Sequence, residues 1–413
     1  MRDVERAVRP VSLLLVLGCT CATLILGSAL KAPCATGAWS DGRQYRLLCY
    51  SDIVPLLHTE QLEGNRLPFI QPCLETGGQC DEYPVLTMYS MRLAAWVGGS
   101  TAAGFFTANA ILLWVCAAAI ATFLYMLGGK ALWFALAPTL LIYGFMNWDL
   151  LAVAFATGAL VAFARRRDGL AGVLLGLGAA AKFYPAMLVV PLIAHRLRDR
   201  EPDSAIKIGW ATAGTWLLVN APFAIASPSS WSTFFRFNSA RGADWDSLWY
   251  IGCTHVRLTA ICGRTSRINV ASLALFASTF LLVWVWKQRR EPAFARWSLA
   301  FPMLVLFLLS NKVYSPQYGL WLLPLFALGA VSLPTFVAFE AADVAAFVTR
   351  FSFFGRLTGV GGLPFGAFEI AIAVRTLILI WCVIEWARRP STALPDLEAS
   401  VTREAVVTTE APA

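Results

Sequence analysis

Charged residues are scarce in this sequence. Asp, Glu, Lys and Arg make up 14% of the 413 residues, whereas soluble domains carry about 25%. Hydrophobic residues reach 58%, which is more than a soluble core of this length can use. The composition therefore excludes an ordinary soluble enzyme and indicates a chain that lies largely inside a membrane.

The sequence also lacks the motifs with which many enzymes hold nucleotides or zinc. It has no glycine-rich dinucleotide fingerprint and no Walker motif, and its hydrophilic segments have no CxxC pair or histidine-rich spacing. A net charge of +8 could point to nucleic acid, but the basic residues stand in short clusters between apolar runs, where they fix the orientation of membrane helices. We therefore predict no zinc site and no nucleic-acid partner.

Long apolar runs dominate what is present. The runs 11–30, 108–127 and 271–286 approach or reach the ~20 residues that a helix needs to cross a hydrocarbon layer of ~30 Å. A chain inside that layer must satisfy its backbone polar groups within helices. The predicted fold class is all-α, a polytopic membrane protein built as a bundle of about 12 transmembrane helices.

The basic clusters give these crossings a direction. Arg2, Arg6 and Arg9 precede the first run, which places the N-terminus inside. A signal peptide is the alternative for this run, but no convincing cleavage site follows at the right distance. With an uncleaved first helix, the two larger outer loops are 31–100 and 228–269.

The remaining crossings follow from the apolar runs between the loops. Segment 169–197 is too long for one helix and is broken at Lys182-Phe183-Tyr184-Pro185, because a residue before proline is pushed out of helical geometry. Two short crossings keep the basic cluster 195–198 inside, which one long tilted helix does not. Segment 84–100 is interpreted as an interfacial or re-entrant helix. The other crossings are expected at 103–127, 131–146, 148–164, 207–227, 270–287, 294–310, 317–333, 334–349 and 366–387.

This threading predicts one transmembrane domain, residues 1–389, in the plasma membrane. Both termini lie in the cytoplasm. The segment 390–413 is rich in Ala, Thr, Glu and Pro, and we predict a disordered tail there.

The ten cysteines divide into two groups. Four lie in apolar runs, and the other six fall in loops that the threading places outside. An even number of cysteines on the oxidising side favours disulfides, although six unpaired thiols are the alternative. The pairs that close the shortest loops are Cys34–Cys49, Cys73–Cys80 and Cys253–Cys262.

The outer side also collects unusual polar residues. A charge at membrane depth costs a few kcal/mol, so it usually pairs, lines a wet cavity or serves a function. Asp149 could instead cap a helix, and Lys182 and Lys312 could reach lipid head groups. Asp52 could be a solvated loop residue. Their joint placement on one side favours a site for an anionic substrate and a general base.

Two further features have simpler explanations. Arg375 lies in the middle of an apolar segment, and we predict that it pairs with a buried acid. Asp244-Trp245-Asp246 has the DxD pattern that holds a metal in nucleotide-sugar enzymes. We interpret it here as a coincidence or an acceptor contact.

Several of these motifs resemble glycosyltransferase family 87, and they occur in order between about residue 45 and residue 325. The resemblance rests on Tyr50-Ser51-Asp52-Ile53, Glu82-Tyr83-Pro84-Val85-Leu86-Thr87, Asn147-Trp148-Asp149-Leu150, Lys182-Phe183-Tyr184-Pro185 and Lys312-Val313-Tyr314-Ser315-Pro316-Gln317-Tyr318.

The resemblance implies a GT-C fold and a metal-independent transfer, without a cofactor, from a polyprenyl-phosphate sugar on the outer face. It implies mannose as the sugar and a lipid or glycan of the cell envelope as the acceptor. It also implies an aspartate base in the first outer loop, where Asp52 lies. The gap between the first helix and Asp52 is longer here than in the family pattern, so Glu82 and Asp81 are alternative candidates for the base.

The other predicted site residues bind the substrates. Lys182 and Lys312, with Arg241 or His255, contact the phosphate. The acids and the amide, Glu82, Asp149 and Gln317, bind sugar hydroxyls or orient these cations. The aromatic rings of Tyr83 and Tyr184 suit a sugar or an isoprenoid. Two alternatives stay open, a transporter or flippase of a lipid-linked sugar, and an inactive scaffold for envelope synthesis.

Overall fold

The computed structural model describes residues 11–37, 39–64, 66–74, 80–99, 101–256, 259–391 and 393–394. Every regular element in these ranges is a helix, which confirms the all-α class. Most of the predicted tail and the basic residues Arg2, Arg6 and Arg9 lie outside the described residues.

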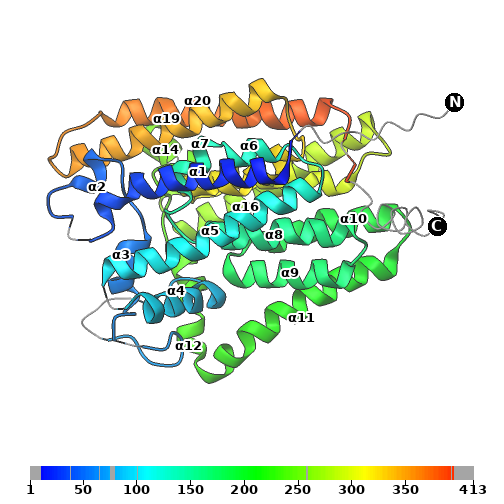
Figure 1. The fold of residues 1–413 in the computed structure, drawn as a ribbon. Helices are drawn as coiled ribbons and strands as arrows, with labels where there is room; N and C mark the ends of the chain where they lie inside the picture. The colour runs from blue at the N-terminus through cyan, green and yellow to red at the C-terminus, as the bar shows by residue number, and fades with distance from the viewer. Residues whose placement is uncertain are drawn as a thin grey trace.

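Within the described residues, five helices are long and apolar enough to cross a membrane, by length and composition. They are α1 (Leu13–Lys31), α5 (Ala102–Met126), α11 (Pro202–Ala226), α16 (Thr265–Arg290) and α20 (Phe365–Arg388). Many of them run in the same general direction (Figure 1). Shorter apolar helices accompany them, including α8 (Asp149–Ala164), α9 (Asp168–Ala181) and α17 (Ala300–Ser310). The membrane character is clear, and the count of about twelve crossings stays a prediction.

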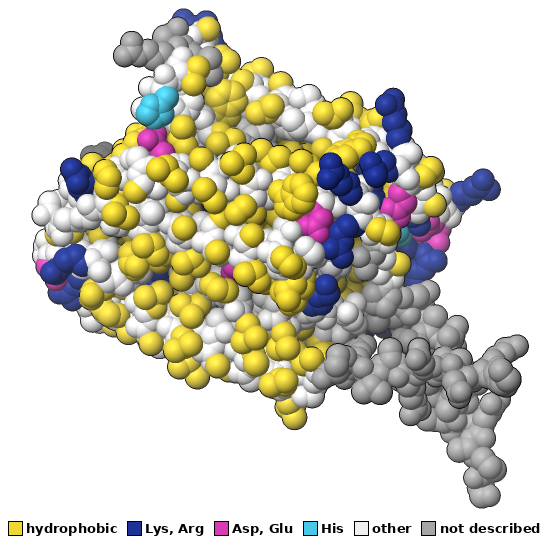
Figure 2. Space-filling view, turned by 90° about the horizontal axis from the view of Figure 1, so that it is seen from above, with side chains coloured by type: hydrophobic (Ala, Val, Ile, Leu, Met, Phe, Trp, Pro, Cys, Tyr) yellow, Lys and Arg dark blue, Asp and Glu magenta, His cyan; other side chains and the backbone are white. Residues whose placement is uncertain are grey.

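The outer surface of the helices is apolar in the way that lipid requires. Leu218 and Ile225 on α11 are 76% and 80% exposed, although a soluble protein buries such side chains. Hydrophobic side chains cover much of the face in Figure 2, and Lys and Arg gather toward one end. At the ends predicted to be cytoplasmic, Arg198 donates to Phe294 O (2.6 Å) and Lys287 to Arg389 O. The basic ends of the predicted crossings thus lie together.

Two of the predicted crossings are shorter helices in the structure. Segment 131–146 is not one continuous helix but α6 (Ala131–Ala135) and α7 (Pro138–Tyr143), because Ala137 before Pro138 is extended. Segment 317–333 contains the turn η5 (Pro316–Tyr318) and the short helix α18 (Gly319–Ala327). In contrast, segment 334–349 belongs to a longer helix, α19 (Leu333–Leu357).

The predicted hairpin at 169–197 is confirmed. Helix α9 ends at Ala181, and the chain returns through η3 (Tyr184–Leu188) and α10 (Val189–Arg198). The reversal is complete, because Arg196 near the end of α10 pairs with Asp168 at the start of α9 (2.8 Å). Helix α9 packs closely on α11, since a side chain at Gly172 would approach Ile208 O to 2.6 Å. Small residues such as Gly172 allow close helix contacts in membranes.

The two loops predicted to lie outside, which we call the first and second outer loops, are largely helical. The first loop contains η1 (Ala32–Cys34), α2 (Arg43–Arg46), α3 (Ile53–Thr59) and α4 (Val85–Gly98), which packs on α5 and α9. The second contains α12 (Pro228–Trp231), α13 (Thr233–Ala240), α14 (Leu248–His255) and α15 (Thr259–Cys262). The structure has the disulfides Cys34–Cys49, Cys73–Cys80 and Cys253–Cys262.

Candidate active site

Asp52 lies where the first outer loop meets the turn after α7. Its backbone N–H donates to Met146 O (2.8 Å), and the Ser51 hydroxyl donates to Phe145 O (2.7 Å). These two bonds hold the start of α3 against residues 145–147. Asp52 therefore faces Asn147, which comes from a distant part of the sequence.

The Asp52 carboxylate accepts hydrogen bonds on both oxygens. Oδ1 accepts from the Tyr50 hydroxyl (2.8 Å), and Oδ2 accepts from Asn147 Nδ2 (2.9 Å) and, at the long distance of 3.5 Å, from Gln317 Nε2. The charge of Asp52, burial and this hydrogen bond raise the pKa of Tyr50 well above its usual value, so Tyr50 remains a neutral donor. These hydrogen bonds fix the orientation of the Asp52 carboxylate.

Asn147 connects the predicted acid to the predicted cation. Its Nδ2 also donates to the Tyr83 hydroxyl (2.8 Å), and its Oδ1 accepts from Lys182 Nζ (3.4 Å). Lys182 pairs with Asp149 Oδ2 at 2.8 Å. We call this group, Asp52, Tyr83, Asn147, Asp149, Lys182 and Gln317, the Asn147 cluster.

The cluster decides between two interpretations left open by the sequence. Asp149 does not cap helix α8, because the cap position is Trp148 and the Asp149 carboxylate bonds Lys182 and Trp321 Nε1. Lys182 does not reach a lipid head group, because its side chain is 16% exposed and points at Asp149. Tyr184 is buried and stacks on Trp321 at a centroid distance of 4.2 Å, so it supports the wall behind Asp149.

Lys312 and Arg241 lie at the base of the second outer loop. Lys312 Nζ donates to Ser239 O (3.1 Å) and Arg241 O (2.6 Å), and Arg241 pairs with Asp244 (3.3 Å). Burial and the neighbouring Arg241 lower the pKa of Lys312. Lys312 thus holds the loop through backbone carbonyls, and the Arg241 guanidinium is the more accessible cation, 35% exposed.

The structure places the last two predicted residues apart from this hydrogen-bond network. Burial raises the pKa of Glu82, and the charge of nearby Arg241 opposes that rise. His255 is 55% exposed and pairs with Glu369 of α20, which is not a member of the Asn147 cluster.

The DxD acids are neutralised by arginines. Arg375 pairs with Asp246 and with Asp343, both at 3.2 Å, which confirms that it is a buried pairing residue. Arg350 of α19 pairs with Asp246 and, at 3.8 Å, with Asp244. Guanidinium groups therefore occupy the directions from which these carboxylates would hold a metal ion.

Sequence reasoning missed two basic residues beside Asp52. Lys31 at the end of α1 is fully buried and donates to Tyr50 O (2.7 Å), and its charge interacts with Asp52. Arg350 interacts electrostatically with both Tyr50 and Asp52. The available signal was a single basic residue within or at the end of an apolar run, which is costly unless paired.

An aromatic pocket adjoins the cluster, and its space of about 270 Å³ includes the part that is open to solvent. Tyr83 links the two, because its ring lines the pocket while its hydroxyl accepts from Asn147. Phe183, the residue after Lys182, forms another part of the wall. The remaining lining comes mainly from α11 and the second loop and includes Trp216, Asn220, Trp231, Phe234 and Phe235. A larger pocket of about 340 Å³ lies elsewhere, beside Trp297 and Trp386.

A sequence model of glycosyltransferase family 87 matches residues 83–310, which is more than half of the chain. The chain belongs to glycosyltransferase family 87. It is therefore a membrane glycosyltransferase, as its apolar helices also indicate. The match includes Tyr83, Asn147, Asp149 and Lys182 of this family 87 member and begins after Asp52.

Solved structures similar to this family 87 member are distant. ArnT from Cupriavidus metallidurans, bound to undecaprenyl phosphate, has 11% identity and a TM-score of 0.46 over 95% of this chain and 78% of ArnT. The oligosaccharyltransferase from Archaeoglobus fulgidus, in its apo form, has 10% identity and a TM-score of 0.43 over 92% of this chain. This chain spans 56% of that oligosaccharyltransferase. No curated protein sequence matches.

Proposed function

We propose that this protein transfers a hexose, mannose, from a polyprenyl-phosphate donor to a lipid or glycan acceptor of the cell envelope. The reaction takes place on the extracytoplasmic face of the plasma membrane, in a GT-C transmembrane domain with both termini in the cytoplasm. The observation that carries the proposal is the Asn147 side chain, which contacts the Asp52 carboxylate and the Lys182 ammonium at once.

In the proposed reaction, Asp52 takes the proton of the acceptor hydroxyl while the hydroxyl oxygen forms a bond to the sugar C1. The bond between C1 and the phosphate oxygen breaks, and the polyprenyl phosphate leaves with the electron pair. The donors Tyr50 and Asn147 hold the Asp52 carboxylate in position to accept that proton. A lipid phosphate is already a fair leaving group, so this route needs no metal.

Cations near the cluster stabilise the departing phosphate. Arg241 has the most accessible charge, and Lys182 is fixed in position by Asp149. Lys312 contributes by holding the chain at Ser239 and Arg241. In this proposal, Glu82 and Gln317 bind the sugar hydroxyls.

The aromatic pocket supports a donor with a long isoprenoid chain. Its walls are mainly aromatic, and helix α11, which forms one of them, is largely exposed. A chain in this pocket ends at Tyr83 and Phe183, next to Lys182. The donor phosphate then lies beside a cation, as charge complementarity requires.

The test is a transfer assay with purified protein in detergent, radiolabelled polyprenyl-phosphate mannose and arabinose, and a membrane lipid extract. We expect mannose to move to an extract component and Asp52→Asn to abolish transfer while the protein stays folded. Asp41→Asn, which removes an exposed acid of the same loop, is the control and should retain activity. Near-normal turnover by Asp52→Asn would exclude Asp52 as the base, and label that moves to no acceptor would favour a transporter.

A further inference from the structure

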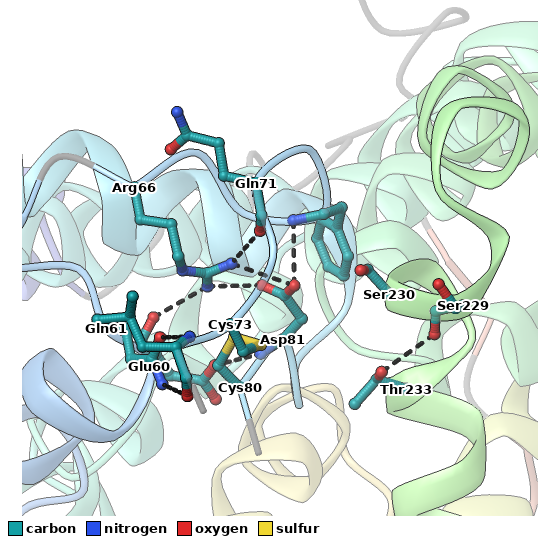
Figure 3. The surroundings of a disulfide bond; sticks show 12 residues. Glu60, Gln61, Arg66, Gln71, Cys73, Cys80, Asp81, Ser229, Ser230 and Thr233 are labelled. Atoms are coloured by element: carbon teal, nitrogen blue, oxygen red, sulfur yellow. Dashed lines mark hydrogen bonds and ion pairs between the residues drawn. A yellow bond between two sulfur atoms is a disulfide. The ribbon is translucent and has the colours of Figure 1, made fainter. Parts of the chain in front are cut away.

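The residues around the Cys73–Cys80 disulfide form a second buried charge cluster, separate from the Asn147 cluster. Arg66 and Asp81 pair there at 2.8 Å, with only 7% and 1% of their side chains exposed. Figure 3 shows the Arg66 guanidinium reaching the Asp81 carboxylate next to the disulfide. The proposed chemistry does not use these residues directly.

We infer that Arg66, Asp81 and Glu60 form a latch that positions Asp52 and Tyr83 against Asn147. They are positioning residues, because none of them touches the reacting atoms in the proposed function, on which this inference rests. The latch joins the far end of the helix that follows Asp52 to the segment that precedes Tyr83.

The first half of the latch is Glu60 at the end of α3. Its carboxylate accepts the backbone N–H of Asp81 (2.6 Å), and its carbonyl accepts from Arg66 Nη2 (3.0 Å). Helix α3 begins directly after Asp52 and has seven residues. A shift of Glu60 is therefore passed along one short helix to Asp52.

The second half is Asp81, which holds its own loop in an unusual conformation. Asp81 and Phe69 both have left-handed backbones, with φ of 63° and 62°. Non-glycine residues adopt this conformation at a cost, and it persists only where surrounding contacts enforce it. Those contacts are the Arg66–Asp81 pair and the bond from Phe69 N–H to the Asp81 carboxylate (3.2 Å).

The two halves of the latch and the Asn147 cluster form a closed ring of contacts. From Asp81 the chain reaches Tyr83, whose hydroxyl accepts from Asn147, and Asn147 donates to Asp52. The Cys73–Cys80 bond precedes Asp81 by one residue and restrains the loop covalently. Cys73, Cys80 and Asp81 also lie within 4.8 Å of one another as possible metal ligands, but the sulfurs are bonded to each other and Asp81 is held by Arg66.

Hydrogen–deuterium exchange of the purified protein tests the latch without reference to activity. Asp81→Asn weakens the ion pair, and Arg66→Lys is a milder second variant because it keeps the charge and loses the forked geometry. We expect faster exchange in both variants at residues 50–59 and 83–90 as well as around 66–81. Asp41→Asn, the matched control in an exposed pair, should leave all these segments unchanged. Faster exchange confined to 66–81 would overturn the inference.

The transfer assay gives the second measurement. Asp81→Asn should lower kcat/KM on the order of 10²-fold, the scale expected when catalytic groups are misplaced by about 1 Å. The loss should fall on kcat at saturating donor and acceptor, because Asp52 is displaced from the acceptor hydroxyl. A rise in KM with an unchanged kcat would contradict the latch. If the wild type transfers no sugar, the proposed function fails, and the exchange result still decides the latch.

Discussion

The Asn147 amide donates to the Asp52 carboxylate at 2.9 Å although the two residues are 95 positions apart. The same amide group accepts from Lys182 and donates to Tyr83. One uncharged side chain thus orients the proposed base, a cation and an aromatic wall residue.

Replacing Asn147 should therefore lower activity strongly, although the side chain is uncharged. We expect Asn147→Ala to lower kcat by about 10²–10³-fold, as loss of an oriented donor does in other enzymes. Thermal unfolding should change little by comparison. Asn238→Ala, which removes an amide bonded within its own helix, serves as the control. Equal losses in both variants would show that the connecting role is wrong.

The Lys182–Asp149 pair should behave as a buried ion pair, because Asp149 is fully buried. Lys182→Met alone leaves an unpaired buried acid, and we expect it to lower the free energy of unfolding by about 3–5 kcal/mol. Adding Asp149→Asn should restore much of that stability but not the activity. The exposed pair Arg43–Asp41 is the comparison, where single substitutions should cost much less stability. Additive losses for Lys182 and Asp149 would contradict this account.

The aromatic pocket predicts sensitivity to the length of the donor chain. Trp216→Ala removes one wall, and we expect it to raise KM about tenfold, or ~1.4 kcal/mol, for a long polyprenyl donor. A donor with two isoprene units should bind the variant and the wild type alike. Trp210→Ala changes an exposed residue of the same helix and should affect neither donor. An equal rise in KM for both donors would place the chain outside the pocket.

Glu60 should make stability depend on pH. Burial is the main cause that raises its pKa to about 8, so the folded protein holds a proton that the unfolded chain releases near pH 4.5. The stabilisation from this proton is complete below about 4.5 and is lost as the pH rises toward 8. Glu60→Gln cannot titrate, so its midpoint of thermal unfolding should rise relative to the wild type between pH 5 and pH 9. A constant difference across this range would show that Glu60 is not a raised, buried acid.

Local properties of the sequence were sufficient for the five long apolar helices and for the break at Lys182. Apolar run length, basic clusters and the residue before proline act within one segment, so they can be read without a fold. The same reasoning missed the break before Pro138, where the apolar run is uninterrupted although the backbone is not.

The composition of the chain determined that it lies in a membrane, and its motifs indicated which residue types meet at the candidate site. Only the tertiary structure decided which side chains touch. Lys312 bonds carbonyls, the DxD acids face Arg350 and Arg375, and Asn147 joins Asp52 to Lys182. The reason is that side-chain partners depend on how separate helices pack. That packing depends on contacts between segments tens to hundreds of residues apart, which no local pattern records.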